Sequence, residues 1–463
     1  MKRRWDALNL AVAGLAGVGL LALGLLAAAA LAQEAPKPVA GLDRINHIIT
    51  IYLENRSFDQ LYGLFPGADG IANAGAAATQ VDRDGKPYDK LPPVLNTNFK
   101  PPKIDTRFPT DLPNNPYRAE PYVSLSQVTG DAWHRYYQEQ LQIDGGKMDK
   151  FVAWSDAGAL VMSYFDGSPA PLWSYAKDYV LMDHFHHAAF GGSFLNHFML
   201  VCACAPRFDG APKDLVAELD EKGMLVKDGS VTPDGYAVNT LLPLHGPLPG
   251  KLDPARLLPV QTAPTIGDRL DEKGIDWAWY SGGWDGAAAG KPGPLFQFHH
   301  QPFAYFEHYA LGSPRAKAHL KDEVDFLDGV ERGSLPQVVF FKPSGEDNEH
   351  PGYASVLAGE YHTALLLRLI ERSPLWKDSV VIITYDENGG LWDHVAPPAV
   401  DRWGPGTRVP TLVISPFAKR GFVDHTVYDT TAILKLIETR FGLAPLGTRD
   451  AGNADMTAAL DFQ

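Results

Sequence analysis

Short apolar runs alternate with helical patterns along most of this chain. The runs have the length and composition of buried strands, and they cover residues 47–53, 179–182, 275–280, 337–341, 380–385 and 409–414. Helical patterns lie between them, for example over residues 353–370 and 430–441. Strands that alternate with helices in this way form a mostly parallel sheet covered on both faces. The sequence therefore predicts a layered α/β fold.

The composition is that of a folded globular protein with an acidic surface. Hydrophobic residues make up 45% and charged residues 21% of the 463 residues, which excludes a disordered chain, collagen and a coiled coil. The 41 Lys and Arg against 55 Asp and Glu give a formal net charge of −14. An acidic chain repels nucleic acid, so we expect no nucleic-acid partner.

The N-terminus has the pattern of an export signal. Basic residues at positions 2–4 precede an uncharged apolar stretch over residues 10–32, which ends in Ala30-Leu31-Ala32, a sequence typical of a cleavage site. We expect residues 1–32 to be a cleaved signal peptide, followed by a linker at residues 33–45, and the protein to be periplasmic or secreted. The alternative is a membrane anchor formed by residues 10–32, because the stretch is long enough to span a bilayer.

The rest of the chain is predicted to be a single domain over residues 46–463. Two segments at about 64–130 and 206–264 are rich in Pro and Gly, so we expect them to be inserted cap loops. The two cysteines, Cys202 and Cys204, are too few for a disulfide scaffold, and their spacing would close only a tight ring. We interpret them as buried thiols.

Carboxylates follow two of the predicted strands at the point where each strand ends. Glu54 and Asn55 follow the first strand, and Asp386 and Glu387 follow the strand at 380–385. Ligands bind beyond the carboxyl ends of parallel strands, and acidic groups gathered there repel one another unless a cation neutralises them. Because oxygen ligands suit hard cations, we expect one divalent metal ion, with Ca²⁺, Mg²⁺ or Mn²⁺ favoured. The alternative is that these side chains only form turns and cap helices.

A glycine-rich turn places a serine at the start of a predicted helix. Gly191-Gly192-Ser193 precedes an apolar stretch over residues 194–201, so Ser193 lies where backbone N–H groups and the helix dipole favour anions. Asn196 lies three residues further on the same helical face and is expected to donate to an oxygen held at Ser193. The alternative is a helix-capping serine without chemistry.

Three of the fifteen histidines are functional candidates. His299 and His300 are adjacent between aromatic residues, and His350 lies in a polar loop. His134 and His394 each lie beside a Trp, where a hydrogen-bonded core histidine is common. We interpret a further group as packing residues, namely His184, His186 and His187.

Three common motifs are missing from the sequence. It contains no G-x-S-x-G, which excludes the nucleophile elbow of the α/β-hydrolases, and no H-E-x-x-H, which excludes a zincin. A P-loop sequence is also absent.

Several sequence blocks together resemble one known family. In chain order they are Glu54-Asn55-Arg56-Ser57-Phe58-Asp59, Gly192-Ser193-Phe194-Leu195-Asn196, Asn348-Glu349-His350-Pro351, Tyr385-Asp386-Glu387 with Asp393-His394-Val395, and Gly406-Thr407-Arg408-Val409-Pro410. They resemble the motifs of the bacterial phosphoesterase family that contains phosphatidylcholine-type phospholipases C and respiratory-burst-inhibiting acid phosphatases. The block from Phe298 to Phe303 is similar to the acid-phosphatase-like branch.

The resemblance implies an alkaline-phosphatase-like three-layer α/β sandwich and metal-dependent hydrolysis of phosphoric esters through a phosphoserine. It makes Ser193 both nucleophile and metal ligand, together with the metal ligands Glu54, Asn55, Asp386 and Glu387. The residues implied to surround the phosphoryl oxygens are His134, Asn196, His299, His300 and His350. Leu195 and His197 depart from the family pattern, which commonly has Pro and Arg at these positions.

Phosphomonoesters are the predicted substrates. His299 and His300 could donate to non-bridging oxygens that only a monoester leaves free, and several imidazoles in one cavity favour catalysis at acidic pH. One alternative is a phospholipase C that cleaves phospholipid diesters, with membrane contact through the lipid or the N-terminal segment. The other alternative is a non-catalytic module that binds phosphate or metal.

Overall fold

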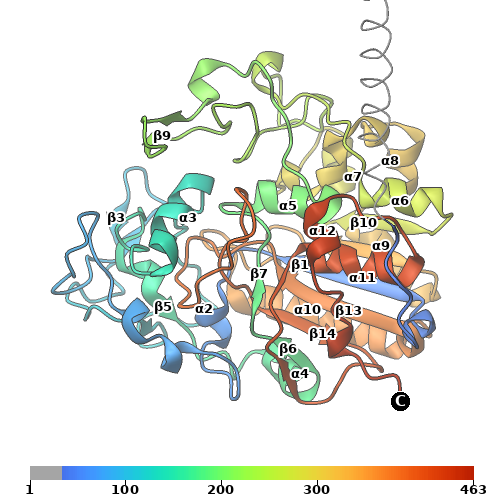
Figure 1. Ribbon diagram of the computed structural model, residues 1–463, viewed down its shortest axis with the longest axis horizontal. Coiled ribbons are helices and arrows are strands. Elements are labelled where there is room, and N and C mark those ends of the chain that lie inside the picture. The colour runs from blue at the N-terminus through green and yellow to red at the C-terminus, as the bar shows by residue number, and fades with distance from the viewer. Residues whose placement is uncertain (1–33) are drawn as a thin grey trace, which may run out of the picture.

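The computed structural model describes residues 34–463, and its centre is an eight-stranded sheet (Figure 1). In order across the sheet, the strands are β11 (Leu320–Lys321), β10 (Trp277–Ser281), β12 (Val338–Lys342), β1 (His47–Leu53), β13 (Ser379–Tyr385), β14 (Thr411–Ile414), β6 (Val180–Met182) and β15 (Phe422–Asp424). Every residue of β10, β12, β13 and β14 is buried. Their sequences are mostly apolar and do not alternate, as expected for strands covered on both faces.

Strand β1 lies in the middle of the sheet and runs parallel to both of its neighbours, β12 and β13. The register aligns Ile51 with Phe341 of β12 and Leu53 with Tyr385 of β13. Because parallel strands end at the same edge of a sheet, the residues that end or follow these three strands gather there. Strand β14 is antiparallel to both β13 and β6, so the sheet is mostly parallel.

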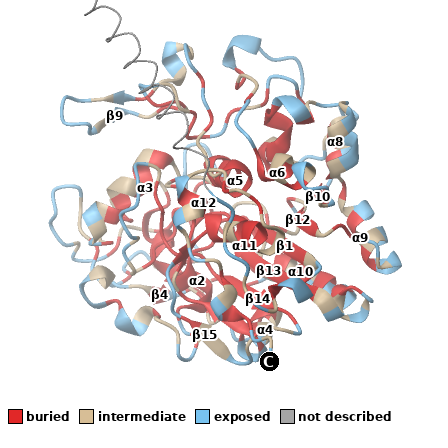
Figure 2. Ribbon diagram, turned by 45° about the vertical axis from the view of Figure 1, so that its right-hand side comes forward, coloured by how far each residue is buried: buried red, intermediate tan, exposed pale blue. Residues whose placement is uncertain are grey.

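Helices cover both faces of the sheet (Figure 1). The helices of one face are α4 (Pro171–Asp178), α9 (Glu323–Arg332) and α10 (Val356–Arg372). Those of the other face are α5 (Ser193–Cys202), α6 (Ile266–Glu272), α11 (Thr431–Phe441) and α12 (Thr448–Gly452). Figure 2 shows the buried residues concentrated in the sheet and in the helices around it. The predicted layered α/β fold is confirmed.

Short elements make up the rest of the described chain. The short helices are α2 (Phe58–Tyr62), α3 (Tyr136–Ile143), α7 (Trp284–Ala288) and α8 (Pro314–His319). The predicted insertion at 64–130 holds β2 (Leu95–Asn96), β3 (Lys103–Ile104) and β4 (Tyr117–Arg118), and that at 206–264 holds β8 (Glu218–Leu219) and β9 (Leu225–Lys227). The remaining strands are β5 (Ser163–Tyr164), which pairs with β4, and β7 (Phe185–His186), which pairs with β16 (Tyr428–Asp429). Figure 1 shows β9 well away from the central sheet.

The predicted signal peptide or anchor lies outside the described residues. Over residues 34–463, no helix combines the length and the apolar character needed to cross a membrane. Part of the predicted linker is packed into the domain, because Leu42 and Ile45 are buried.

The two cysteines are bonded to each other, so the interpretation as free thiols was wrong. Helix α5 ends at Cys202, and Ala203 has a left-handed backbone with a φ of 48°. This turn leaves the Cα atoms of Cys202 and Cys204 5.1 Å apart, within the range of a disulfide. The spacing of the cysteines in the sequence does not show that the helix ends between them.

Candidate active site

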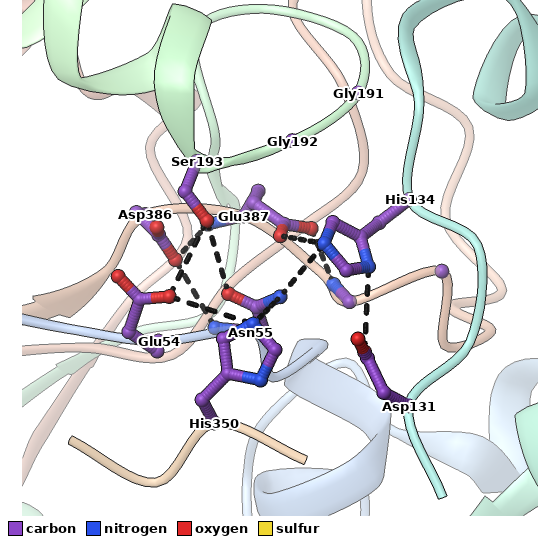
Figure 3. A network of polar contacts seen from close by, with 12 residues as sticks. Glu54, Asn55, Asp131, His134, Gly191, Gly192, Ser193, His350, Asp386 and Glu387 are labelled. Carbon is purple, nitrogen blue, oxygen red and sulfur yellow. Dashed lines mark hydrogen bonds and ion pairs between the residues drawn. The ribbon is translucent and has the colours of Figure 1, made fainter. Parts of the chain in front are cut away.

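Three neighbouring strands bring charged and polar side chains to one edge of the sheet (Figure 3). Glu54 and Asn55 follow β1, Asp386 and Glu387 follow β13, and Lys342 is the last residue of β12. All five residues are 0% exposed. The backbone N–H of Asn55 donates to Asp386 Oδ1 over 3.1 Å, which ties two strand ends together.

Ser193 is the first residue of α5 and points at these strand ends (Figure 3). Its Oγ lies 3.3 Å from both Glu54 Oε2 and Asn55 Oδ1. The N-cap position belongs to Gly192, so Ser193 does not cap the helix. Its hydroxyl instead faces the carboxylates, as the predicted nucleophile would.

Two pairs of glycines, Gly191-Gly192 and Gly389-Gly390, allow the loops of the site to approach one another closely. Gly191 has a φ of 86°, and a Cβ at Gly192 would lie 2.9 Å from His134 O. A Cβ at Gly390, which has a φ of 68°, would overlap Trp133 O. The loop before Ser193 and the loop after β13 are therefore both packed against the segment that carries His134.

Asn196 supports the loop before Ser193 and does not line the cavity. Its Nδ2 donates to Ala189 O over 2.9 Å and to Gly192 O over 3.2 Å, and its Oδ1 accepts from Ala189 N over 2.9 Å. The side chain is buried, and its donors are already satisfied. This arrangement differs from the predicted contact with substrate oxygens, because helical spacing indicates the face of a residue but not its partner.

His134 and His350 both direct an imidazole nitrogen at Asn55. Their Nε2 atoms lie 3.4 Å and 3.2 Å from Asn55 Nδ2. Their Nδ1 atoms donate to backbone carbonyls, Ala132 O at 2.6 Å and Pro351 O at 2.5 Å. Burial lowers the pKa of His350 below its ordinary value. With Nδ1 protonated, Nε2 accepts a hydrogen bond in the neutral ring and donates one in the charged ring.

His299 and His300 lie on different sides of Glu54. His299 lines the cavity. His300 Nε2 lies 2.7 Å from Glu54 Oε1, behind the face of the carboxylate that meets Ser193. Burial, although opposed by the charge of Glu54, lowers the pKa of His300 to about 4. The predicted pair therefore lies at one centre, but of the two only His299 lines the cavity.

A cavity of about 290 Å³ opens onto Ser193. The predicted site residues that line it are Glu54, His134, Ser193, His299 and His350. Sequence reasoning missed other lining residues, which include Asp131, Arg135, Asn239, Thr240, Gln297 and Tyr353. Arg135 could have been suspected because it follows His134 directly. Asn239 and Thr240 come from the predicted insertion at 206–264, where the sequence offered no signal.

The buried carboxylates have the properties of metal ligands. Asp386 Oδ2 and Glu387 Oε1 have no hydrogen-bond partner within residues 34–463. Burial and the charge of Glu54 raise the pKa of Asp386 to about 7, and burial and Asp386 raise the pKa of Glu387 well above its ordinary value. A bound cation would relieve both effects. The oxygen donors of Glu54, Asn55, Ser193, Asp386 and Glu387 therefore fit a hard divalent ion.

Three other histidines belong to structural networks. His394 Nδ1 lies 2.6 Å from Asp59 Oδ2, beside the buried Arg408. His186 Nδ1 donates to Gly406 O over 2.9 Å, and His187 Nε2 lies 2.9 Å from Glu139 Oε1. The packing interpretation is confirmed for these last two residues.

The fold and this site define a class of protein, an α/β protein with a buried serine and a cluster of carboxylates at the carboxyl edge of its sheet. The model of the Phosphoesterase family matches residues 45–444, and the chain belongs to this family. The protein is therefore a phosphoric ester hydrolase.

Curated relatives of the chain include bacterial phospholipases C. The chain is 25% identical to phospholipase C A of Mycobacterium tuberculosis, a match that covers 91% of this chain and 78% of the relative. It is also 25% identical to the non-hemolytic phospholipase C of Pseudomonas aeruginosa, over 91% of this chain and 58% of the relative.

Solved structures show a looser similarity. The chain is 11% identical to an alkaline phosphatase superfamily protein from Vibrio parahaemolyticus, with a TM-score of 0.34 over 63% of this chain and 64% of that one. It is 11% identical to murine ectonucleotide pyrophosphatase/phosphodiesterase 5, with a TM-score of 0.36 over 63% of this chain and 95% of that one.

Proposed function

We propose that the enzyme hydrolyses phosphomonoesters through a phosphoserine at Ser193, with one divalent metal ion bound. The observation that carries this proposal is the position of the Ser193 hydroxyl. It lies 3.3 Å from Glu54 and Asn55, in a cavity that His134, His299 and His350 also line.

Ser193 would act as the nucleophile, and Glu54 would polarise its hydroxyl. Glu54 Oε2 accepts a hydrogen bond from Ser193 Oγ. The neighbouring His300 and Lys342 outweigh burial and hold the pKa of Glu54 well below its ordinary value, so Glu54 is ionised. A divalent ion held by Glu54, Asn55, Ser193, Asp386 and Glu387 would further lower the pKa of the serine hydroxyl. Attack forms the Ser193 Oγ–P bond and breaks the bond from phosphorus to the leaving oxygen, while the hydroxyl proton passes to Glu54 Oε2, which accepts its hydrogen bond.

His350 is suited to protonate the leaving alcohol. His350 lines the cavity, its Nε2 lies 3.2 Å from Asn55 Nδ2, and the Nδ1 hydrogen bond to Pro351 O fixes the orientation of the ring. Burial lowers the pKa of His350, so the charged form that donates from Nε2 is populated only at a more acidic pH than in an ordinary histidine. Water then attacks the phosphoserine, which releases phosphate and restores the Ser193 hydroxyl. This scheme favours an acid-phosphatase-like pH dependence.

The lining of the cavity supports a small, polar phosphate ester. The cavity measures about 290 Å³, and Arg135 adds a cation to its histidines. Arg135 is held in place by an ion pair with Asp228. Phospholipid diesters are the second candidate substrate, because the relatives described above are named phospholipases C.

One set of assays tests this proposal. We expect the purified enzyme to cleave p-nitrophenyl phosphate with a higher kcat/KM than p-nitrophenyl phosphorylcholine, and a chelator to abolish both activities. Folded Ser193→Ala protein should lose activity by about 10³-fold or more. Faster cleavage of the phosphorylcholine diester would reverse the substrate assignment, and an active Ser193→Ala protein would exclude the nucleophile.

We further propose that the enzyme works in the periplasm or outside the cell. The disulfide between Cys202 and Cys204 supports this location, because disulfides persist in oxidising compartments. Cell fractionation and N-terminal sequencing of the mature protein test the proposal. An N-terminus at residue 33 is expected, and activity confined to the cytoplasm would contradict it.

A further inference from the structure

Lys342 is a fully buried cation at the centre of the site. It ends β12, next to the end of β1, and is 0% exposed. Its Nζ lies 2.5 Å from Glu54 Oε1 and 3.8 Å from Asp386 Oδ2, and it donates to Leu53 O over 3.2 Å. A buried ammonium is strongly unfavourable unless it is paired, so the contact with Glu54 is the main reason that it is tolerated.

The two oxygens of Glu54 have different neighbours. Oε2 faces the Ser193 hydroxyl at 3.3 Å. Oε1 faces away from the cavity and contacts both Lys342 Nζ at 2.5 Å and His300 Nε2 at 2.7 Å. The carboxylate is therefore held from behind, which leaves one oxygen for the nucleophile and a metal ion.

The groups around Glu54 Oε1 resemble the lining of a cation site. Ligand atoms of Glu54, His197 and His300 lie within 4.8 Å of one another, and all three residues are buried. The rings of His197 and His300 are stacked, with centroids 5.3 Å apart and an interplanar angle of 6°. His197 Nε2 has no hydrogen-bond partner within residues 34–463. Lys342 contacts this group through Glu54, because its Nζ lies 2.5 Å from Glu54 Oε1.

We propose that Lys342 is a permanent second cation of the centre and occupies the place where a second metal ion would otherwise bind. The proposal rests on the single-metal centre of the proposed function. With the metal bound, Glu54, Asp386 and Glu387 would carry three negative charges, which one ammonium and one divalent ion balance. Before the metal binds, Lys342 is the cation that partly neutralises the cluster. Lys342 is a positioning residue, because it acts on Glu54 and does not touch the cavity.

The test compares Lys342→Met with wild-type protein, with Lys435→Met as the matched control. Lys435 is a half-buried lysine on α11 that donates to Ala451 O, outside the site. The unfolding temperature of each full chain is measured in chelator and with Mn²⁺, Mg²⁺ or Ca²⁺, and bound Mn²⁺ is counted by elemental analysis. These readouts do not depend on activity.

We expect Lys342→Met to unfold at a lower temperature in chelator. We also expect the metal to raise the unfolding temperature of Lys342→Met by at least about 1.5 times the rise in wild type. In the variant the metal faces three carboxylates without the lysine charge. Lys435→Met should respond to metal as wild type does. Wild type should hold one Mn²⁺ per chain. A metal effect in Lys342→Met that is equal to or smaller than in wild type, or two Mn²⁺ per wild-type chain, would overturn the proposal.

A double variant covers the case in which Lys342→Met does not fold. Glu54→Gln/Lys342→Met removes both charges of the pair. If the double variant folds where Lys342→Met does not, the pairing is supported; if both fail to fold, the proposal is overturned. A different result would contradict the proposed function, namely that the wild-type chain binds no metal and shows no metal-dependent activity.

Discussion

His299 and His300 are adjacent in sequence, yet their rings lie at 82° to each other with centroids 4.7 Å apart. As a result, His299 lines the cavity while His300 contacts Glu54 Oε1. The sequence predicts that the two act together on phosphoryl oxygens. The geometry separates them into a group that lines the cavity and a group that contacts Glu54, a predicted metal ligand.

Substitution of each histidine separately should reveal this division. His299→Ala should lower kcat/KM for p-nitrophenyl phosphate by about 10- to 100-fold without weakening metal binding, because it removes a donor from the cavity. His300→Ala should weaken metal binding by about 10- to 100-fold, as loss of a residue that orients a ligand does. Metal titrations and steady-state kinetics on both variants measure the two effects. Identical profiles for the two variants would contradict the division.

Asn196 offers a second test, which asks whether this residue supports the loop before Ser193 or contacts the substrate as the sequence predicts. Because its amide holds Ala189 and Gly192, Asn196→Ala should destabilise the protein by about 1–3 kcal/mol in urea denaturation and lower kcat by misplacing Ser193. Asn196→Asp should be no better, since a carboxylate cannot donate to the two carbonyls. If Asn196 instead contacted the substrate, the Ala variant would keep its stability and show only a raised KM.

The sequence predicts the strands well because their signal is local. The run at 47–53 matches β1 residue for residue, and the end of the run at 380–385 coincides with the end of β13. The direction of β14 could not be predicted, because it depends on how a long connection crosses the sheet. Strands β11 and β15 have only two and three residues, which is too short for a periodic pattern.

The acidic part of the site was also predictable, since residues that follow parallel strands must meet at one edge. Lys342 was missed although it directly follows the predicted strand at 337–341, just as Glu54 and Asp386 follow theirs. A lysine at that position usually reaches solvent, and only the packing of three strand ends shows that this one is enclosed. The orientation of His300 depends on contacts with Glu54 and His197, which lie far away in the sequence.

Arg408 links three of the sequence blocks in the core rather than in the site. Its Nε lies 2.8 Å from Asp393 Oδ1, its Nη2 lies 3.2 Å from Asp59 Oδ1, and its Nη1 donates to Asp183 O. Arg408→Met should cost about 3–5 kcal/mol of unfolding free energy, because it leaves two buried carboxylates without their cation. Arg408→Lys should recover little, since an ammonium cannot make the same paired contacts. A loss below 1 kcal/mol in denaturant titrations would show that the network is not a stabilising element.

Glu360 should make the stability of the fold depend on pH. This residue of α10 is 2% exposed, and its Oε2 accepts from Leu172 N at the start of α4 over 2.7 Å. Burial, only partly offset by that hydrogen bond, raises the pKa of Glu360 to about 8. In the unfolded chain the same carboxyl titrates near its ordinary value of about 4.3.

Between these two pKa values the folded protein therefore holds a proton that the unfolded chain has lost. The stabilising contribution of this proton is fully present below about pH 4 and is lost as the pH rises to about 8. Glu360→Gln keeps an acceptor for Leu172 and does not titrate. Urea denaturation from pH 5 to pH 8 should thus show a shallower decline in the variant, by up to about 1.4 kcal/mol per pH unit. Parallel curves for wild type and Glu360→Gln would mean that Glu360 is already ionised in the fold.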